Sequence, residues 1–258
     1  MGKVYLVGAG PGDPGLITVK GLRLIRSADV ILYDRLVNEA LLSEAKHSAE
    51  LIYCGKLPHS HPLKQEAINH LLVLNARKNR TVVRLKGGDP FIFGRGGEEA
   101  AFLAKEGIAF EIVPGITAGI AAPAYAGIPA THRKFASSIA FVAGHPKSGG
   151  AEKIQWDKLA TGVDTLAIYM GVAGLPNIVS ELVSHGRTPS TPVALIEWGT
   201  TVHQRTVAST LSGIVEEAAK HHIQSPAMII VGEVVRLRQE LKWFENMEGP
   251  FSVVREAF

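Results

Sequence analysis

The run from Val82 to Glu99, VVRLKGGDPFIFGRGGEE, constrains the fold more than any other stretch of this chain. It begins with β-branched residues typical of a strand, continues through a glycine pair and Asp89-Pro90, and ends in acidic residues that favour a helix start. A plain strand-to-helix connection needs only about two to six residues and no such density of glycine. Glycine also lets the backbone approach a ligand closely. The run therefore predicts a ligand-binding loop at the carboxyl end of a strand, with an ordinary glycine-rich turn as the alternative.

Short apolar, β-branched runs alternate with helical patterns through the first part of the chain. We expect strands at residues 4–7, 30–33, 51–53, 82–85 and 110–113, and helices at 19–28, 39–45, 64–78 and 98–105. Alternating strands and helices are typical of a mainly parallel sheet covered by helices. The pattern predicts an α/β fold.

Proline and glycine in the segment 114–119 predict a hinge, after which the pattern stays α/β with more strand. Further strands are expected at 138–142, 165–169, 193–196 and 227–231, with helices at 175–184 and 211–221. We therefore predict two α/β domains, an N-terminal one at residues 1–115 and a C-terminal one at 116–258, with mainly parallel or mixed sheets.

Composition excludes several classes of protein. With 46% apolar and 20% charged residues the chain is globular, and its single cysteine excludes an internal disulfide framework. The net charge of +3 comes without blocks of basic and aromatic residues, so nucleic acid is not the expected partner. No apolar run approaches the roughly 20 residues of a membrane span, and no signal peptide is apparent, so we expect a cytoplasmic protein. The histidines lack the spacing of a metal site, and no metal is expected.

The glycine-rich segment 8–15 follows the first expected strand and invites comparison with dinucleotide-binding loops. The dinucleotide pattern needs a glycine three positions after Gly10, where this chain has Asp13. Pro11 and Pro14 also lack the N–H groups that bind a pyrophosphate. The segment therefore predicts a ligand other than a nucleotide diphosphate.

Two residues that follow expected strands are candidates for proton transfer. Asp34 comes directly after the second strand and can act as a general base, or it can simply pair with Arg35 or cap the next helix. Lys56 follows the third strand through Gly55, and can bind a carboxylate or donate a proton. A solvated surface lysine is the alternative for Lys56.

Basic residues cluster near the glycine-rich turns. Arg84, Lys86 and Arg95 flank the glycine loop that begins at Gly87, and Arg133 follows the segment 127–132. Arginine suits bidentate recognition of carboxylates, so the cluster predicts a polyanionic substrate. A surface salt bridge is the alternative for any one of these arginines.

Several motifs along residues 3–244 together resemble the uroporphyrinogen-III C-methyltransferases, within the wider tetrapyrrole methylase family. The resemblance is carried by residues 8–13, 33–37, 84–99, 113–118, 127–129, 131–133, 169–171 and 225–227. Such enzymes also form the C-terminal part of fused sirohaem synthases. Because this chain begins at the methylase strand, we expect the stand-alone form.

The resemblance implies a class III methyltransferase fold that binds S-adenosyl-L-methionine in a trough between two α/β domains. The implied reaction methylates uroporphyrinogen III at C-2 and C-7, giving precorrin-2 for sirohaem or cobalamin biosynthesis and S-adenosyl-L-homocysteine as by-product. Such enzymes are homodimers and use no metal.

The resemblance also implies roles for individual residues. Asp34 is the implied proton acceptor and Lys56 the implied proton donor. The implied cofactor-binding residues are Pro11, Gly87, Gly88, Asp89, Ile92, Thr117, Ala118, Met170, Gly199 and Ala227. The substrate-binding residues that we expect are Arg35, Arg84, Arg95 and Arg133. The chain departs from the usual pattern of these methyltransferases at Leu57, Ala130 and Ala143. These departures concern substrate binding.

Three other functions are considered. A tetrapyrrole methylase acting on a later precorrin is disfavoured by the long match over residues 84–99. A ribosomal RNA methyltransferase should carry a stronger basic surface. A non-catalytic ligand-binding protein is disfavoured by the intact Asp34, Lys56 and loop glycines.

Overall fold

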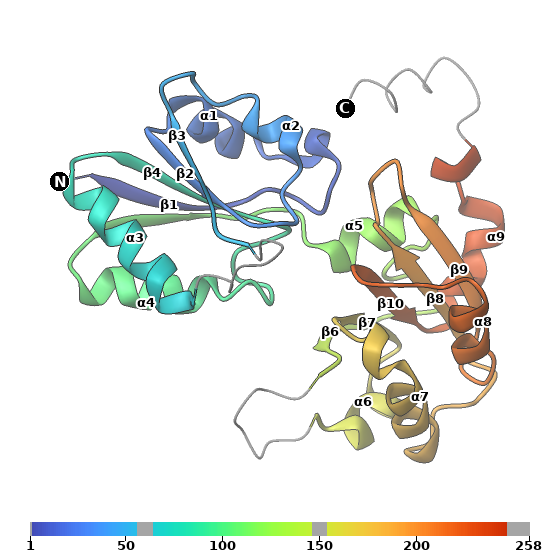
Figure 1. Cartoon of the computed structure of the whole chain (residues 1–258). Coiled ribbons are helices and arrows are strands. Elements are labelled where there is room, and N and C mark those ends of the chain that lie inside the picture. The colour runs from blue at the N-terminus through green and yellow to red at the C-terminus, as the bar shows by residue number, and fades with distance from the viewer. Residues whose placement is uncertain (1, 56–63, 146–153, 247–258) are drawn as a thin grey trace. The chain divides into compact units, whose positions relative to one another are not determined.

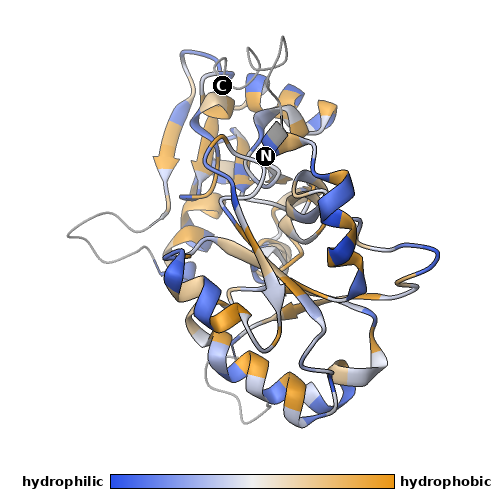
Figure 2. Cartoon of the chain, turned by 90° about the vertical axis from the view of Figure 1, so that its right-hand side faces the viewer, coloured by the Kyte–Doolittle hydropathy of each residue, from blue (hydrophilic) through white to orange (hydrophobic). Residues whose placement is uncertain are grey.

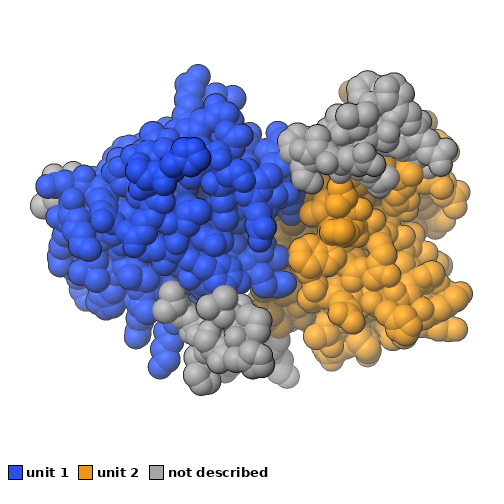
Figure 3. Space-filling model, turned by 45° about the horizontal axis from the view of Figure 1, so that its top comes forward, with its two compact units in different colours: residues 1–117, 258 blue, residues 118–257 orange. Residues whose placement is uncertain are grey.

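The computed structural model describes residues 2–55, 64–145 and 154–246. The chain forms two compact units, a first unit at residues 1–117 and a second unit at residues 118–257 (Figures 1 and 3). It passes from one unit to the other between Thr117 and Ala118, while the domain boundary expected after Gly115 stays a prediction. Within the described residues, no helix is long and apolar enough to cross a membrane.

The first unit is built on a sheet of parallel strands in the order β3-β2-β4-β1-β5. The strands are β1 (Lys3–Gly8), β2 (Val30–Tyr33), β3 (Glu50–Tyr53), β4 (Thr81–Lys86) and β5 (Ala109–Val113). Strand β4 is central, with β2 on one side and β1 on the other. Because all strands run the same way, the segments that follow them emerge at one edge of the sheet.

Helices cover both faces of this first sheet (Figure 1). They are α1 (Val19–Ser27), α2 (Glu39–Leu42), α3 (Gln65–Arg77) and α4 (Gly96–Lys105). Successive strand residues point to opposite faces, so Val4 and Val82 pack with α3 and α4, whereas Val7 and Val83 pack with α1 and α2. Both faces are therefore apolar, as in buried parallel sheets.

The second unit contains a mixed sheet in the order β6-β7-β10-β8-β9. Its strands are β6 (Ile139–Ala143), β7 (Thr165–Tyr169), β8 (Pro192–Glu197), β9 (Arg205–Thr210) and β10 (Ala227–Val231). Strands β6 and β7 are parallel, and the remaining pairs are antiparallel. The predicted α/β fold class, with parallel and mixed sheets, is confirmed.

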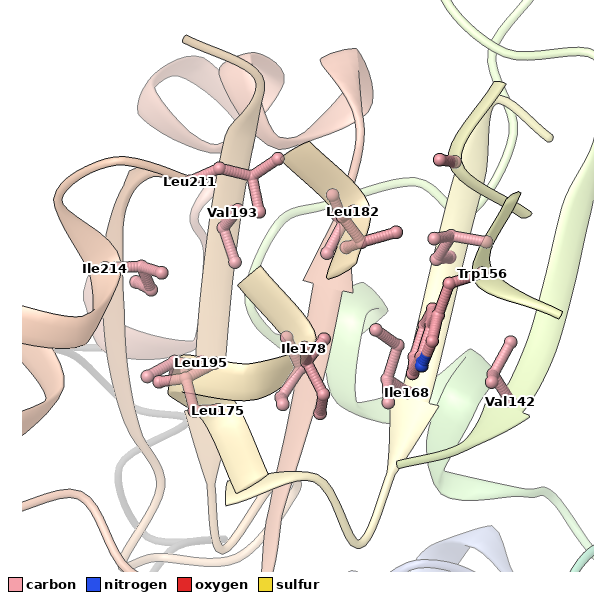
Figure 4. Close-up of a cluster of buried hydrophobic side chains, with 14 of the residues drawn as sticks. Val142, Trp156, Ile168, Leu175, Ile178, Leu182, Val193, Leu195, Leu211 and Ile214 are labelled. Atoms are coloured by element: carbon pink, nitrogen blue, oxygen red, sulfur yellow. The ribbon is translucent and has the colours of Figure 1, made fainter. Parts of the chain in front are cut away.

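Helices also pack on both faces of the second sheet. On one face lie α6 (Trp156–Gly162), α7 (Leu175–Ser184) and α8 (Ile214–Lys220). Figure 4 shows their buried side chains, such as Trp156 and Ile178, beside Ile168 of β7. On the other face lies α5 (Ala118–Tyr125), whose Ala122 packs with apolar residues of β8 and β10. The short helix α9 (Arg238–Leu241) follows β10.

Sequence and structure differ mainly at helix ends. The helix expected at 39–45 ends at Leu42, and the one expected at 211–221 begins only at Ile214. In Figure 2 the longer helices alternate hydrophobic and hydrophilic residues, as expected for helices with one buried side. The first and last residues of such helices depend on capping and on fraying of the end turns, which the apolar periodicity of the sequence does not indicate.

Candidate functional site

The sequence-predicted residues of the first unit gather at the carboxyl edge of its parallel sheet. Segment 8–15 follows β1, Asp34 follows β2, the loop 87–95 joins β4 to α4, and Gly115 follows β5. The glycine-rich run thus lies where the sequence placed it, between a strand end and a helix start. Ligands of open α/β sheets bind at this edge.

Four glycines at this edge let the loops pack directly on one another. Gly88 donates its N–H to the carbonyl of Gly10 at 2.6 Å, and Gly10 donates back at 3.2 Å. A Cβ atom on Gly8 would lie 2.5 Å from the nitrogen of Gly115 and 2.6 Å from the carbonyl oxygen of Gly88. Part of the glycine content therefore serves backbone contact between loops, independently of any ligand.

The carboxylate of Asp89 fastens the loop 87–95 to the end of β5. One oxygen accepts the N–H of Phe91 at 2.7 Å, and the other accepts the N–H of Gly115 at 3.0 Å. Further along, Phe93 and Arg95 adopt left-handed backbone conformations, and Gly96 donates to the carbonyl of Pro90 at 2.9 Å. The loop is held by its own hydrogen bonds, and the cofactor role expected for Asp89 stays a prediction.

Two cations lie on one face of the central strand β4. Arg84 and Lys86 alternate with Leu85, so both point to the side of α3 and α4, and both are buried. They contact Asp34, which follows β2, and Glu99 in the first turn of α4. We call Asp34, Arg84, Lys86 and Glu99 the buried quartet.

Each cation of the buried quartet contacts both carboxylates. Arg84 donates from Nη2 to Oδ1 of Asp34 at 2.6 Å and from Nε to Oε1 of Glu99 at 3.0 Å. The Nζ atom of Lys86 lies 3.1 Å from the same Oε1 of Glu99 and 3.8 Å from Oδ2 of Asp34. Two negative and two positive groups balance, which lowers the cost of burying them.

Burial and mutual charge set the protonation of the two cations. Burial by itself lowers the pKa of Arg84, but the charges of Asp34 and Glu99 outweigh it and raise that pKa above its usual value. Burial, helped by the charge of Arg84, lowers the pKa of Lys86, and Glu99 and Asp34 oppose that shift. The ionised state of Lys86 thus depends on the two carboxylates beside it.

Asp34 is the most accessible member of the buried quartet. Its side chain is 32% exposed, whereas those of Arg84 and Glu99 are 2% and 0% exposed. Asp34 pairs with Arg84 of the neighbouring strand, a partner that sequence reasoning did not consider. The guanidinium of Arg84 also points at carbonyl oxygens of Leu32 and Leu85, so its donors are engaged inside the protein. Its expected role in substrate binding stays a prediction.

The other candidates in the first unit are spread along the same edge. Arg95 is exposed and forms a bidentate pair with Glu98 at 2.8 and 2.7 Å. Arg35 is also exposed, while Thr117 is buried. Pro11 and Ile92 are half-buried. Lys56, the expected proton donor, and Leu57 lie outside the described residues.

The second unit brings its own cofactor candidates to one edge of its sheet. Ile229 pairs with Ile168 and Ala227 with Glu197 in antiparallel register, so the ends of β7 and β8 lie beside the start of β10. Met170, Gly199 and Ala227 therefore share this edge. Ala118 opens α5, whose Gly119 donates its N–H to the Tyr169 hydroxyl at 2.8 Å.

Backbone strain marks this edge of the second unit. Met170 and Trp198 adopt left-handed conformations, with φ angles of 53° and 47°. Both side chains are exposed, Met170 by 48%. Left-handed backbone is costly for non-glycine residues and is frequent at ligand sites. Arg133 lies apart from this group, in an exposed turn closed by His132 and Ala136.

The chain is similar to proteins of known type over most of its length. The family model for tetrapyrrole (corrin/porphyrin) methylases matches residues 3–215. A uroporphyrinogen-III C-methyltransferase of Priestia megaterium is 65% identical over 235 residues, covering 91% of this chain and 99% of that protein. A siroheme synthase of Pseudomonas entomophila is 53% identical over 96% of this chain, which spans only 53% of that protein.

A solved structure supports the same assignment. The uroporphyrin-III C-methyl transferase of Thermus thermophilus complexed with S-adenyl homocysteine has a TM-score of 0.79 and 43% sequence identity. The match covers 92% of this chain and 94% of that chain. These similarities confirm the resemblance that the motifs predicted.

Proposed function

We propose, from the premise that this chain belongs to the tetrapyrrole (corrin/porphyrin) methylase family, that it methylates uroporphyrinogen III with S-adenosyl-L-methionine. The observation that carries the proposal is the 65% identity to a uroporphyrinogen-III C-methyltransferase along nearly the whole of both chains. The finer proposal is methylation at C-2 and C-7 to give precorrin-2. We further propose a homodimer in the cytoplasm.

The residues present fit an S-adenosyl group. Such a group has a flat apolar part and a positively charged sulfur, and it is held by main-chain groups and an apolar wall. The second unit offers exposed Met170 on strained backbone, beside Gly199 and Ala227. In the first unit, Gly87 packs its backbone against Leu36, where a Cβ atom would approach to 2.9 Å. We assign the cofactor to the residues expected from the sequence, including Pro11 and Ile92.

The bound cofactor supplies a methyl group on a sulfonium, a good leaving group that needs no metal. A ring carbon of the substrate gains the methyl group as the sulfur–carbon bond breaks, and the macrocycle then releases a proton. Asp34 is the proposed acceptor, because its carboxylate is partly exposed and one oxygen is fixed by Arg84. Aligning two reactants can contribute about 7–11 kcal/mol to catalysis, so orientation is the larger part of the enzyme's work.

The substrate carries carboxylate groups around its rim, and exposed arginines suit them. Arg35, Arg95 and Arg133 are exposed and are proposed to bind these carboxylates. Arg84, which the sequence also suggested for substrate binding, is buried and holds Asp34, so its contact with substrate stays a prediction. Lys56 stays the proposed proton donor.

Methyl transfer from labelled S-adenosyl-L-methionine to uroporphyrinogen III, under anaerobic conditions, tests the proposal. We expect a doubly labelled product and calorimetric binding of S-adenosyl-L-homocysteine. Label transfer only to a later precorrin would instead assign the chain to another step of the same family. Tight binding of the cofactor product without turnover on any of these substrates would indicate a non-catalytic protein.

A further inference from the structure

We infer that Glu99 is a positioning residue that holds Arg84 and Lys86 against Asp34 and so fixes the proposed proton acceptor. The inference rests on the proposed function, because it concerns how Asp34 is presented to the substrate. The side chain of Glu99 is fully buried on α4, so Glu99 does not contact the substrate directly. We therefore expect Glu99 to act on the reaction through the groups that it contacts, above all the two cations.

A single oxygen of Glu99 organises the whole group. Oε1 accepts from Nε of Arg84 at 3.0 Å, from Nζ of Lys86 at 3.1 Å and from Nε2 of Gln65 at 3.1 Å. Nη2 of Arg84 donates to Oδ1 of Asp34 at 2.6 Å, and the same Nζ of Lys86 that contacts Glu99 lies 3.8 Å from Oδ2 of Asp34, an ion-pair distance. The carboxylate of Asp34 is thus held by one hydrogen bond from Arg84 and one longer ion pair with Lys86, both from the buried side.

The second oxygen of Glu99 shows that stability alone does not account for this arrangement. Oε2 is buried and has no hydrogen-bond partner in the described structure. Leaving a buried polar atom without a hydrogen-bond partner is energetically unfavourable. Buried ion pairs can often be replaced by apolar side chains without loss of stability. A fully buried carboxylate with one unpaired oxygen is therefore a poor way to stabilise a core, and a good way to place two cations.

Glu99 also controls the charge on Lys86. The groups facing Lys86 are Arg84 on its own strand, Asp34 after β2, Glu99 on α4 and the Cys54 thiol after β3. Burial and Arg84 lower the pKa of Lys86, and Glu99 opposes them more strongly than Asp34 does. Removing the charge of Glu99 lets Lys86 lose its proton at lower pH, which removes one of the two contacts to Asp34.

The test compares E99Q with the parent chain and with E106Q. Glu106 lies at the end of the same helix and pairs with Arg77 on the surface at 2.8 Å, so it serves as a matched control. Loss of a general base costs about 10²–10⁴-fold, and a misoriented one should cost less, so we expect kcat to fall about 10-fold in E99Q. We expect the alkaline limb of the kcat–pH profile to move to lower pH, and S-adenosyl-L-homocysteine affinity to stay within about 2-fold.

A double variant measures how much of the effect of Glu99 passes through Lys86. E99Q/K86M removes one charge of each sign and leaves Asp34 paired with Arg84. If Glu99 acts through Lys86, E99Q lowers kcat by a smaller factor in the K86M background than in the parent. Additive losses, or an unchanged pH profile in E99Q, would overturn the inference. Absence of methyl transfer in the parent chain would instead overturn the proposed function, so the two failures are distinct.

Discussion

The Asp34 carboxylate accepts a hydrogen bond from Nη2 of Arg84 at 2.6 Å, although the two residues stand 50 positions apart in the chain. They meet because β2 and β4 are parallel neighbours, with Tyr33 paired to Leu85. Asp34, which follows β2, thus lies beside a side chain of β4, the neighbouring strand in the sheet. Arg84 on the central strand β4 therefore orients Asp34, the proposed proton acceptor, from its buried side.

Substitution D34N tests the proton acceptor directly. Asparagine keeps the shape of the side chain but cannot take up the proton, so we expect kcat to fall about 10²–10⁴-fold. Affinity for S-adenosyl-L-homocysteine, measured by calorimetry, should be unchanged. The matched control is D157N, at an exposed position in the first turn of α6, which should keep full activity. Wild-type turnover in D34N would remove Asp34 from the mechanism.

Replacing Arg84 and Arg95 by alanine should separate stability from substrate binding. R84A leaves the buried Glu99 and the partly exposed Asp34 without their main cation, which costs about 3–5 kcal/mol in urea unfolding. R95A removes an exposed pair and should change stability by less than about 1 kcal/mol. It should, however, raise KM for uroporphyrinogen III and spare cofactor affinity. Equal loss of substrate and cofactor affinity in R95A would refute its role.

The glycine contacts at the sheet edge predict opposite effects of two alanine substitutions. G115A places a methyl group against the backbone of Gly8 and Gly88, so we expect a loss of about 1–3 kcal/mol in unfolding free energy. G97A lies in α4 with no atom within 4 Å of its new methyl group. Alanine favours the helix over glycine, so G97A should gain about 0.5–1 kcal/mol. Equal stability of the two variants would contradict the packing described.

Acid should weaken an ion pair at the surface of the first sheet. Hydrogen bonds from Lys20 and Lys3 lower the pKa of Glu111 on β5 from its ordinary 4.5 to about 2. A carboxyl whose pKa is lower in the folded state stabilises the protein above its unfolded pKa. We expect this contribution to be complete above pH 4.5 and lost as pH falls towards 2.

The measurement is the melting temperature of the parent chain and of E111Q across that pH range. The difference between them should shrink below pH 4.5, and should also shrink in high salt, because exposed charges are screened. A difference that is constant from pH 7 to pH 2 would show that the Glu111 charge contributes nothing.

Much of the fold was predictable because its elements have strong local signals. The strand at 30–33 and the helix at 175–184 agree with β2 and α7 at both ends. Apolar β-branched runs and helical periodicity indicate which side chains are buried, and in both sheets the strands and the helices that cover them bury apolar side chains. The strand β9 was missed, because its Thr and Ser residues at a sheet edge give no apolar run. Helix α5 was missed since it contains Pro123 and small residues.

The candidate site was predictable in part. Asp34 and Arg84 were both singled out, but their pairing depends on strand order, which a single sequence does not report. Glu99 was missed, because an acidic residue in the first turn of a helix usually needs no further explanation. One signal was present. Arg84 and Lys86 stand two apart in an otherwise apolar strand, so both must be buried on one face and need anionic partners there.

Strand order has a last consequence for synthesis of the chain. Strand β1 is made before both of its neighbours, β4 and β5, and its Lys3 pairs with Thr81 and Ala109. On the ribosome this apolar segment therefore waits until residue 109 has emerged before both of its edges are covered. In the second unit, β8 and β9 are joined by residues 198–204 alone and can pair as soon as both have appeared. A strand that is made long before its partners thus most needs protection from aggregation.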